Sequence, residues 1–468
     1  MAKRSHVTVY SDDDLLTDRA EEFLGRNLSS ATVGVYRTGR QRQNLLTGFV
    51  VTPGEISCDL REGGTAPPIG VIIKSPLKRG RAKLRLKPDT SLLYSSGILR
   101  VLQQPPRFQD VPFLFVGTEV SEIAELIPGP NLADLLQWYN TRIARASRKL
   151  QRCGDENPKG KVYGRQLREV ERAVRMRFES ACDLEIRLTK ALTEKAEAFR
   201  KNGVAIRTQN DDYVRRKVEK CLGTLVRRAT ELTILPSSEE IYQRAISSIS
   251  ASKGLVRVQE LVSQKERMTK NQPLLIIHGD FPPNVVEERR QYAGKVADGK
   301  PVRYVAVDFG DTEYSSNVGE VATLIRSSGF SGIETIMGDS YLNWAIDAYM
   351  TKLNEHGLAE EGASLNLDAI ALSDLLLYDC VLGASFSDKF IRLADYLKIN
   401  NPVNEGKIRN PPMRLLIAQE MTRNLDLLAR AMTNTSNDFG DETNAIFDLA
   451  KVLGDHYRNE TTQLLGTA

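Results

Sequence analysis

The amino-acid sequence predicts an α+β protein in which a small β-sheet near the N-terminus is followed by a larger, mostly helical part. Short strand-like runs separated by turns occupy roughly the first quarter of the chain, whereas apolar residues recur every three or four positions across its middle. The chain has 468 residues, more than one ordinary hydrophobic core accommodates, so roughly two to four structural units are expected.

The N-terminal elements are indicated by capping residues and by short apolar runs. Residues 11–28 begin with Ser11 and three aspartates, which favour a helix start because they cap it and suit the positive end of its dipole. Strands are expected at 33–36, 44–51, 69–74 and 111–120, with a helical stretch at 92–104 before the last of them.

A domain boundary is predicted at residues 128–130. Their sequence is Pro-Gly-Pro, which interrupts regular structure, and Asn131 behind it is suited to cap the next helix. We therefore expect an N-terminal domain over 1–127 and a helical domain over 128–468.

The most regular feature of the helical domain is an apolar stripe between residues 167 and 199. It lacks the sustained heptad and paired charges of a coiled coil, so it is interpreted as the core-facing side of a helical hairpin rather than as a dimer interface. The stripe consists of Leu167, Val170, Val174, Phe178, Ala181, Leu184, Leu188, Leu192, Ala196 and Phe199. Further helices are expected near 340–356, 367–398, 411–433 and 443–464.

Positive charge is concentrated in one region of the chain. The net charge is +4, but residues 141–220 contain 22 Lys and Arg against 12 Asp and Glu. Such a region is either a solvated surface or a face that binds nucleic acid or an acidic protein partner, and both interpretations stay open.

The cysteine pattern and the hydropathy pattern both concern the compartment. The chain has five scattered cysteines and no CxxC pair, which is typical of reduced thiols, so a cytoplasmic location is expected. No run of about 18 apolar residues occurs, and no apolar segment follows the basic residues at the N-terminus. Neither membrane association nor export is therefore predicted.

Acidic and amide side chains follow two apolar runs in the second half of the chain. The first run delivers Asp280, with Asn284 on the next turn, and the second delivers Asp308. We interpret the strands within 273–280 and 302–311 as a β-hairpin that brings these side chains to adjacent strand ends. An oxygen-rich cluster of this kind suits Mg²⁺, which prefers one or two carboxylates together with substrate phosphates.

Four segments resemble, in the same order, motifs of the aminoglycoside phosphotransferase and choline kinase family. GVIIKSP (70–76) is similar to the third-strand lysine motif, and AELIPGPNLADLL (124–136) to the hinge segment with its following helix. HGDFPPN (278–284) resembles the catalytic loop, and VDFGDTEYSSNVGEVATLI (307–325) the metal-binding aspartate segment. In outline the resemblance covers residues 30–330.

The resemblance implies a two-lobed protein-kinase-like fold. An N-lobe over 1–127, made of the N-terminal helix and a small antiparallel β-sheet, would bind the nucleotide. A large, mostly helical C-lobe over 128–468 would contain a basic helical insertion at about 137–265 and a catalytic hairpin at 273–312. The implied reaction is Mg²⁺-dependent transfer of the γ-phosphate of ATP or GTP to a hydroxyl of a small-molecule acceptor.

The resemblance also implies roles for individual residues. Asp280 would accept the proton of the attacking hydroxyl, Asp308 would bind Mg²⁺, and Asn284 would complete the metal site. Lys74 would hold phosphate oxygens of the nucleotide.

Two further groups would bind the nucleotide through the main chain. Thr38 and Gly39 lie in the turn between the first two strands, where this fold covers the phosphates, although the multi-glycine signature is missing. Main-chain groups from Glu125 to Ile127 would take the adenine edge.

Three residues near the motifs admit two interpretations each. His278 is favoured as a structural brace of its loop over a base, and Asp311 as a turn residue over a second metal ligand. Glu320 is explained equally well as a surface residue or as a substitute for the aspartate that helps to fix the catalytic loop in the family.

The sequence departs from the family pattern near both the loop and the lysine. Asn284 follows Asp280 by four residues rather than the usual five, and no glutamate between Lys74 and Gln104 is available to pair with the lysine, which leaves only Asp89. These departures leave open an alternative function, a degenerate kinase-fold module whose basic insertion binds nucleic acid or an acidic protein. Nucleotidyl transfer and protein phosphorylation are less favoured.

Overall fold

The computed structural model describes separate stretches of the chain, most of them in its N-terminal half. The described residues are 5–6, 13–25, 34–37, 42–44, 49–61, 63–76, 91–119, 121–154, 157–208, 228, 275–279, 281, 284–288, 302–315, 324–325, 333–337, 340–357, 422, 425, 451–460 and 462–463. The predicted helix at 367–398 lies outside them, as does most of the one at 411–433.

The chain divides into two compact units, each made of three separate segments. The first unit comprises Met1–Leu132, Asp183–Arg207 and Leu275–Tyr314, and the second comprises Ala133–Cys182, Thr208–Leu274 and Ser315–Ala468. The predicted catalytic hairpin thus belongs with the N-terminal sheet by its contacts. The physical reason is that residues of the predicted hairpin hydrogen-bond to the segments before β6 (Leu114–Gly117) and after β7 (Glu122–Glu125), since Ala306 N–H donates to the Asp110 carbonyl oxygen and Glu287 N–H to that of Pro130.

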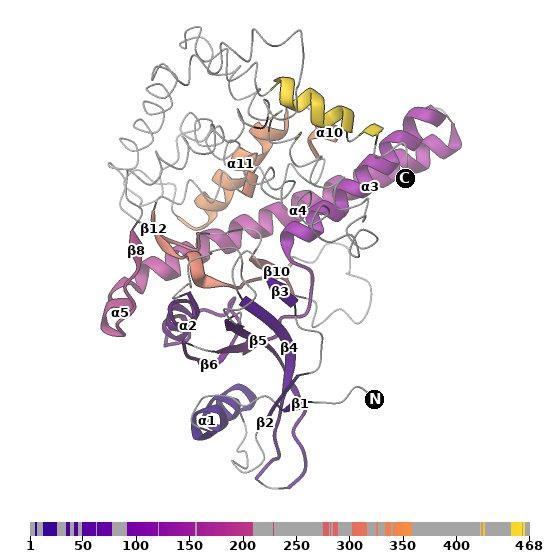
Figure 1. The fold of residues 1–468 in the computed structure, drawn as a ribbon. Helices are drawn as coiled ribbons and strands as arrows, with labels where there is room; N and C mark the ends of the chain where they lie inside the picture. The colour runs from indigo at the N-terminus through magenta and orange to yellow at the C-terminus, as the bar shows by residue number, and fades with distance from the viewer. Residues whose placement is uncertain are drawn as a thin grey trace. The chain divides into compact units, whose positions relative to one another are not determined.

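The first unit is built on an antiparallel sheet of seven strands in the order β1-β2-β4-β5-β7-β6, with β3 paired to β4 (Figure 1). The strands are β1 (Ser5–His6), β2 (Gly34–Arg37), β3 (Arg42–Asn44), β4 (Phe49–Ser57), β5 (Ile69–Pro76), β6 (Leu114–Gly117) and β7 (Glu122–Glu125). The expectation of a small antiparallel sheet in this part of the chain is confirmed.

One face of this sheet carries the hydrophobic core of the first unit. Helix α1 (Asp13–Leu24) contributes Leu16 and Ala20, which pack with alternate residues of the strands such as Ile73 of β5 and Ile123 of β7. Because successive strand residues point to opposite faces, Lys74 and its cross-strand neighbour Glu122 lie on the other face. Helix α2 (Ser91–Leu102) contacts β6 and β7.

Two small sheets follow later in the chain, and they correct the predicted hairpin. Strand β10 (Val285–Glu287) pairs with β11 (Tyr304–Ala306), whereas β9 (Leu275–Ile277) lies in a second sheet of order β8-β12-β9 with β8 (Arg207–Thr208) and β12 (Glu313–Ser315). The strand within 302–311 therefore pairs with the residues after the catalytic-loop motif rather than with those before it. The two valines that follow Asn284 form the partner strand.

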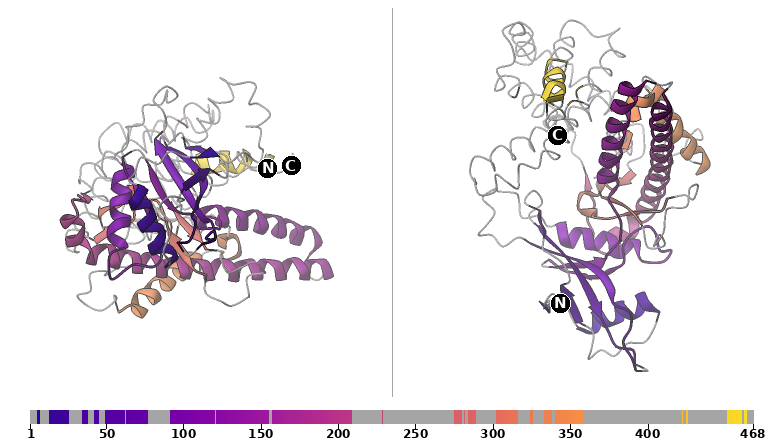
Figure 2. Two further views of the ribbon diagram at one scale, coloured as in Figure 1. Left: turned by 90° about the horizontal axis from the view of Figure 1, so that it is seen from below. Right: turned by 90° about the vertical axis from the view of Figure 1, so that its right-hand side faces the viewer.

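Most of the long helical hairpin belongs to the second unit, and the end of its second helix, from Asp183 on, belongs to the first. Helix α3 (Leu132–Cys153) is followed by α4 (Pro158–Glu194), and the two lie side by side (Figure 2). Lys149 lies 5.4 Å over the ring of Tyr163, and Arg177 lies 5.2 Å over the ring of Tyr139. Lys149 near the end of α3 thus meets Tyr163 near the start of α4, and Tyr139 near the start of α3 meets Arg177 further along α4. The two helices are therefore antiparallel.

The apolar stripe of α4 and of the short helix α5 (Ala196–Lys201) is buried within the chain, which confirms its interpretation as a core-facing seam. Eight of its ten residues are at most 3 % exposed, namely Val170, Val174, Phe178, Ala181, Leu184, Leu188, Leu192 and Phe199. In the second unit, Phe178 packs 5.1 Å from Trp344 of α11 (Ser340–Glu355), and α10 (Ile333–Met337) precedes α11. No described helix is long and apolar enough to cross a bilayer.

Candidate functional site

The candidate site is centred on Lys74 of β5, whose ammonium group lies between two carboxylates. Lys74 Nζ is 3.1 Å from Asp308 Oδ1 and 3.6 Å from Glu122 Oε1. Burial by itself would lower the pKa of Lys74, but the carboxylates of Asp308 and Glu122 outweigh it, so the pKa of Lys74 is raised. Lys74 is therefore a fixed positive charge at any physiological pH.

Asp308 reaches this site from the turn that follows β11. Its backbone is in the left-handed region, with φ 62° and ψ 76°, and it is the single non-glycine residue with a positive φ among the described residues. Such a conformation costs about 1–3 kcal/mol for an ordinary residue and persists where the surroundings impose it. The next residue, Phe309, is fully buried, whereas 43 % of the Asp308 side chain is exposed. The strained turn thus holds a carboxylate at the surface beside Lys74.

His278 supports the Asp308 turn through contacts with the residues on either side of Asp308. Its side chain is fully buried, and Nε2 donates a hydrogen bond to the Val307 carbonyl oxygen at 3.0 Å. Its ring meets that of Phe309 edge-on, with centroids 4.8 Å apart. Burial lowers the pKa of His278 to about 4, so the imidazole is neutral near pH 7. These are the properties of the structural brace that the sequence favours.

The loop after His278 approaches the Asp308 turn so closely that it requires glycine. Gly279 has φ +90°, and a Cβ atom there would lie 2.0 Å from the main-chain oxygen of Asp311. Thr312 Oγ1 donates to the His278 carbonyl oxygen at 3.4 Å, and Tyr94 of α2 donates through its hydroxyl to the Thr312 carbonyl oxygen at 2.5 Å. The two motif segments and α2 are therefore joined directly.

Arg207 adds a second connection between the same elements. Its guanidinium donates to the Gly310 carbonyl oxygen at 3.0 Å and lies 4.6 Å over the ring of Tyr94. The main-chain N–H of Arg207 donates to the Tyr94 hydroxyl at 3.3 Å. Tyr94 is thus held from both sides, next to the turn that carries Asp308.

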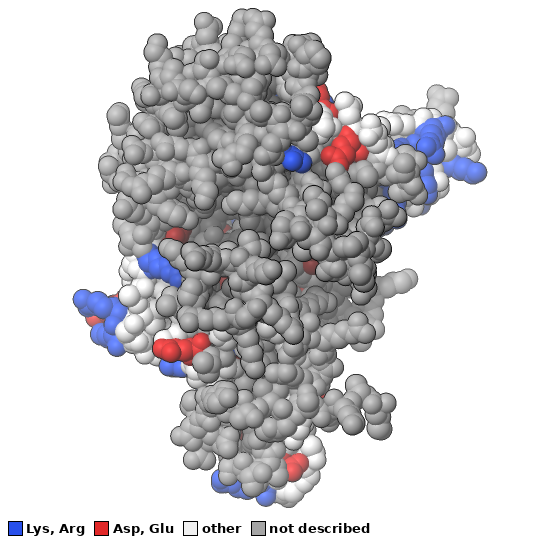
Figure 3. Space-filling view, in the orientation of Figure 1, with Lys and Arg blue, Asp and Glu red and all other residues white. Residues whose placement is uncertain are grey.

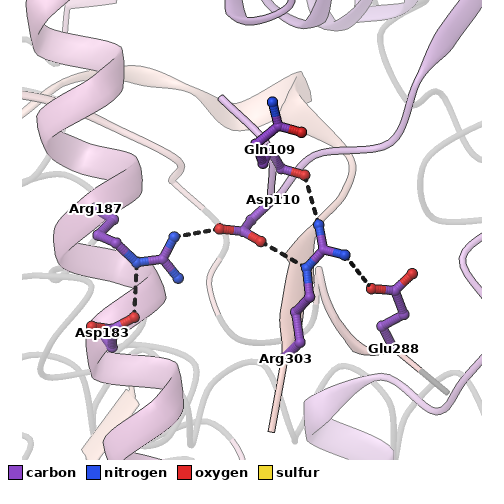
Figure 4. A network of polar contacts seen from close by, with 6 residues as sticks. All are labelled: Gln109, Asp110, Asp183, Arg187, Glu288 and Arg303. Carbon is purple, nitrogen blue, oxygen red and sulfur yellow. Dashed lines mark hydrogen bonds and ion pairs between the residues drawn. The ribbon is translucent and has the colours of Figure 1, made fainter. Parts of the chain in front are cut away.

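A polar network around Asp110 joins three distant segments of the first unit (Figure 4). The buried Asp110 carboxylate accepts hydrogen bonds from Arg187 of α4 and from Arg303 Nε at 3.0 Å. Arg303 also pairs with Glu288 at 2.7 Å and donates to the Gln109 carbonyl oxygen at 3.0 Å. The network therefore fastens β11, which leads to Asp308, to α4 and to the loop before β6.

The other predicted metal and catalytic residues are placed in part. The carbonyl oxygen of Asn284 accepts a hydrogen bond from Val307 N–H at 2.8 Å, which brings its main chain next to the Asp308 segment. Asp280 lies outside the described residues, although Gly279 before it and the buried Phe281 after it are described. Thr38, Gly39, Asp89 and Glu320 are also outside them.

The hinge segment retains one candidate for the adenine edge. Glu125 N–H donates to the Phe113 carbonyl oxygen at 2.8 Å and Leu126 N–H donates to that of Gly70 at 2.9 Å, so both donors belong to the sheet. The Glu125 carboxylate accepts from Phe113 N–H at 3.0 Å. The main chain of Ile127 has no hydrogen bond to another described residue. Of the three main-chain N–H groups from Glu125 to Ile127, that of Ile127 is the one with no hydrogen-bond acceptor among the described residues.

Glu122 was not predicted as a partner of Lys74. A partner was expected between Lys74 and Gln104, whereas Glu122 lies on β7, directly across from Lys74 in the strand register. The available signal was a glutamate in the strand before the Pro-Gly-Pro segment. Recognising this glutamate as the partner of Lys74 requires the knowledge that β5 and β7 are neighbours in the sheet, which the order of the strands in the sequence does not reveal.

The donor set fits a magnesium ion that is held mainly by phosphates. Among the described residues, no three His, Cys, Asp or Glu side chains lie together as ligands for a metal ion. Mg²⁺ in nucleotide sites usually has one or two carboxylate ligands, with phosphates and water supplying the others. The exposed carboxylate of Asp308 beside Lys74 is suited to such an ion.

Comparisons with known proteins show only remote similarity. No family model and no curated protein matches the sequence. Among solved structures, a choline kinase from Cryptosporidium parvum Iowa II is 9 % identical with a TM-score of 0.36, covering 94 % of this chain and 92 % of that one. A fructosamine-3-kinase from Thermobifida fusca YX-ER1 is 14 % identical with a TM-score of 0.28, covering 80 % and 93 %. Similarity at this level does not assign a function to the chain.

Proposed function

We propose that the protein is a Mg²⁺-dependent phosphotransferase that moves the γ-phosphate of ATP or GTP to a hydroxyl of a small-molecule acceptor. The observation that supports this most strongly is the 3.1 Å approach of Lys74 Nζ to Asp308 Oδ1. Lys74 comes from β5 and Asp308 from the turn after β11, more than 200 positions apart, and together they bring a permanent cation next to an exposed carboxylate. A site for a nucleoside triphosphate uses a lysine to bind phosphate oxygens and a carboxylate to hold the metal ion, and these are the two charges found here.

The residues of the site divide the work of phosphoryl transfer between positioning and charge neutralisation. Lys74 binds phosphate oxygens, and Asp308 with Asn284 holds Mg²⁺, which when bound neutralises the developing negative charge. Asp280 orients the acceptor hydroxyl and accepts its proton. Gly279, which has φ +90° and lies close against the main chain of Asp311, immediately precedes Asp280 in the sequence. Ile127 offers main-chain groups to the adenine edge.

His278 is the neighbouring base that this mechanism does not use. Its Nε2 is committed to the Val307 carbonyl oxygen, and its side chain is fully buried. A residue that takes a proton from an external hydroxyl must reach that hydroxyl directly or through one water. The proton acceptor in this loop is therefore assigned to Asp280 rather than to His278.

The proposal is tested by measuring Mg²⁺-dependent hydrolysis of ATP and GTP, and phosphate transfer to a panel of amino alcohols, sugars and aminoglycosides. Asp280→Asn, Asp308→Asn and Lys74→Met should each lower kcat/KM by about a hundredfold or more. Asp347→Asn, an exposed aspartate on α11, is the matched control and should leave the rate unchanged. Inactivity of the wild type with both nucleotides across the whole panel, or full activity of Asp308→Asn, would contradict the proposal.

The tip of the α3–α4 hairpin supports a second candidate function, a non-catalytic module that binds nucleic acid. The exposed cations there are Arg142, Arg145, Lys149, Arg152, Lys159, Lys161, Arg165 and Arg168. None of them forms an ion pair with another described residue. Figure 3 shows Lys and Arg side chains gathered at this tip. A concentration of unpaired cations on two adjoining helices suits a phosphate backbone.

This second function is tested by the anisotropy of fluorescein-labelled 20-nucleotide RNA and DNA at several salt concentrations. Binding should weaken steeply with salt, and Arg145→Glu with Lys161→Glu should weaken it further and reduce the salt slope. Lys451→Glu, an exposed lysine far along the chain, serves as the control charge reversal. If affinity does not depend on salt or on charge reversal at the tip, the tip is not a nucleic-acid-binding surface. Binding of an acidic polypeptide but not of RNA would instead indicate that the tip binds a protein partner.

A further inference from the structure

Helix α2 lacks the acidic residue that the phosphate-binding lysine of this kind of site usually receives from a helix. The sequence of α2 is SLLYSSGILRVL, which contains no aspartate or glutamate. Lys74 nevertheless has a buried carboxylate partner, Glu122, which comes from the neighbouring strand β7. The hydroxyl of Ser96, on α2, donates to that carboxylate at 3.0 Å.

We propose that Glu122 is the positioning residue that holds Lys74 for the nucleotide phosphates, and that Ser96 links this pair to helix α2. The inference rests on the proposed phosphotransferase function and adds two residues to its site. The carboxylate of this pair comes from the sheet, and the helix contributes a hydroxyl.

The geometry assigns each oxygen of Glu122 its own partner. Oε1 lies 3.6 Å from Lys74 Nζ, and Oε2 accepts the Ser96 hydroxyl at 3.0 Å. Lys74 and Glu122 are directly opposite in the β5–β7 register, so the sheet itself sets their separation. A lysine held in this way stays in place without support from a flexible loop.

The two carboxylates that flank Lys74 differ in exposure, which separates their roles. The side chain of Asp308 is 43 % exposed and that of Glu122 is 4 % exposed. A ligand that enters from solvent reaches Asp308, whereas Glu122 is covered. Asp308 is therefore the partner available to a bound ion, and Glu122 is the permanent partner of Lys74.

The position of α2 against the sheet determines whether Ser96 reaches Glu122. A Cβ atom at Gly117 of β6 would lie 2.4 Å from the Cβ of Ser96, so the helix approaches this strand as closely as only glycine permits. Tyr94, on the same helix, hydrogen-bonds the Thr312 carbonyl oxygen near Asp308. A displacement of α2 would thus disturb both the lysine and the aspartate ends of the site.

A double-mutant cycle on nucleotide affinity tests this role. Dissociation constants for ATP are measured by isothermal titration calorimetry in wild type, Glu122→Gln, Lys74→Met and the double variant. If Glu122 acts through Lys74, Glu122→Gln should weaken ATP binding about tenfold in the wild-type background and have no effect in the Lys74→Met background. Ser96→Ala should show a smaller loss with the same dependence on Lys74.

Two further variants distinguish positioning from general stability. The double variant Ser96→Glu with Glu122→Ser places the carboxylate on the helix instead of the sheet. It should bind ATP more tightly than Glu122→Ser alone. Glu125→Gln is the matched control, because Glu125 is also buried on β7 but hydrogen-bonds Phe113 rather than Lys74. Its effect on affinity should be the same with and without Lys74.

The outcomes separate this inference from the proposed function. Equal weakening by Glu122→Gln in both backgrounds would make Glu122 a purely structural residue and overturn the inference, while leaving the phosphotransferase proposal intact. Failure of the wild type to bind either ATP or GTP would overturn the proposed function, and the positioning role with it. If Glu122→Gln does not fold, Ser96→Ala in both backgrounds decides between the same two results.

Discussion

Protonation of His278 should destabilise the protein as the pH falls below neutrality. The folded protein buries this histidine completely and its pKa is about 4, whereas an exposed histidine in the unfolded chain has a pKa of about 6.5. The unfolded state therefore binds the proton more tightly. The stability that results is fully present above about pH 6.5 and is lost as the pH falls towards 4.

The magnitude follows from the two pKa values. Between pH 7 and pH 5 the unfolded state gains about 0.7 of a proton at this position and the folded state gains almost none. This difference lowers the free energy of unfolding by about 2 kcal/mol, and the complete shift corresponds to about 3 kcal/mol. For a protein of stability about 5–15 kcal/mol, a change of this size is readily measured.

The assay is urea unfolding of wild type and His278→Gln at pH 7, 6 and 5, followed by circular dichroism. The variant is expected to be less stable at pH 7, because it loses the packing against Phe309, but its stability should fall less steeply with pH. The difference in slope should be about 2 kcal/mol over this range. Parallel pH dependences for the two proteins would refute a neutral, buried His278. His456→Gln, at a half-buried histidine, provides the comparison.

Three more substitutions test other parts of the site. Asp110→Asn should lower the free energy of unfolding by about 2 kcal/mol, since Arg187 and Arg303 lose a charged acceptor but remain partly solvated. Thermal denaturation measures this loss, and a loss no larger than that of Asp347→Asn would contradict a stabilising role of the network. Gly279→Ala should cost more than about 3 kcal/mol and abolish activity, whereas Gly154→Ala, also at positive φ but in open space, should cost about 1 kcal/mol. Arg207→Gln should lower activity by about tenfold with little change in urea midpoint, and an unchanged rate would show that the Gly310 contact does not position the Asp308 turn.

Local patterns in the sequence predicted the longer helices that the structure describes and several of its strands, but not β1, β7, β8, β10 or β12. The stripe from Leu167 to Phe199 repeats every three or four residues, and its buried face follows directly from that repeat. The run at 69–74 alternates in burial as a half-buried strand does, with Ile73 in the core and Lys74 on the other face. In each case the signal lies within a few turns or residues, so it is legible without the rest of the chain.

The pairing of distant segments was less accessible. The strand at 302–311 was assigned to the wrong partner, because the apolar run before Asp280 and the two valines after Asn284 are equally strand-like. Pairing depends on where the intervening turn places each run. Such information is distributed over the fold, since a register or partner choice is decided by packing rather than by local propensity.

The sequence alone determined the residue types of the candidate site, a lysine on an apolar strand and an aspartate after another, together with the helical hairpin and its basic charge. The tertiary structure alone decided that Lys74 and Asp308 meet, that Gly279 lies close against Asp311, and that Glu122 is the second carboxylate beside Lys74. The reason is physical: burial patterns are periodic and local, whereas the contacts of a site join segments that only the order of strands in the sheet and the closure of long loops bring together.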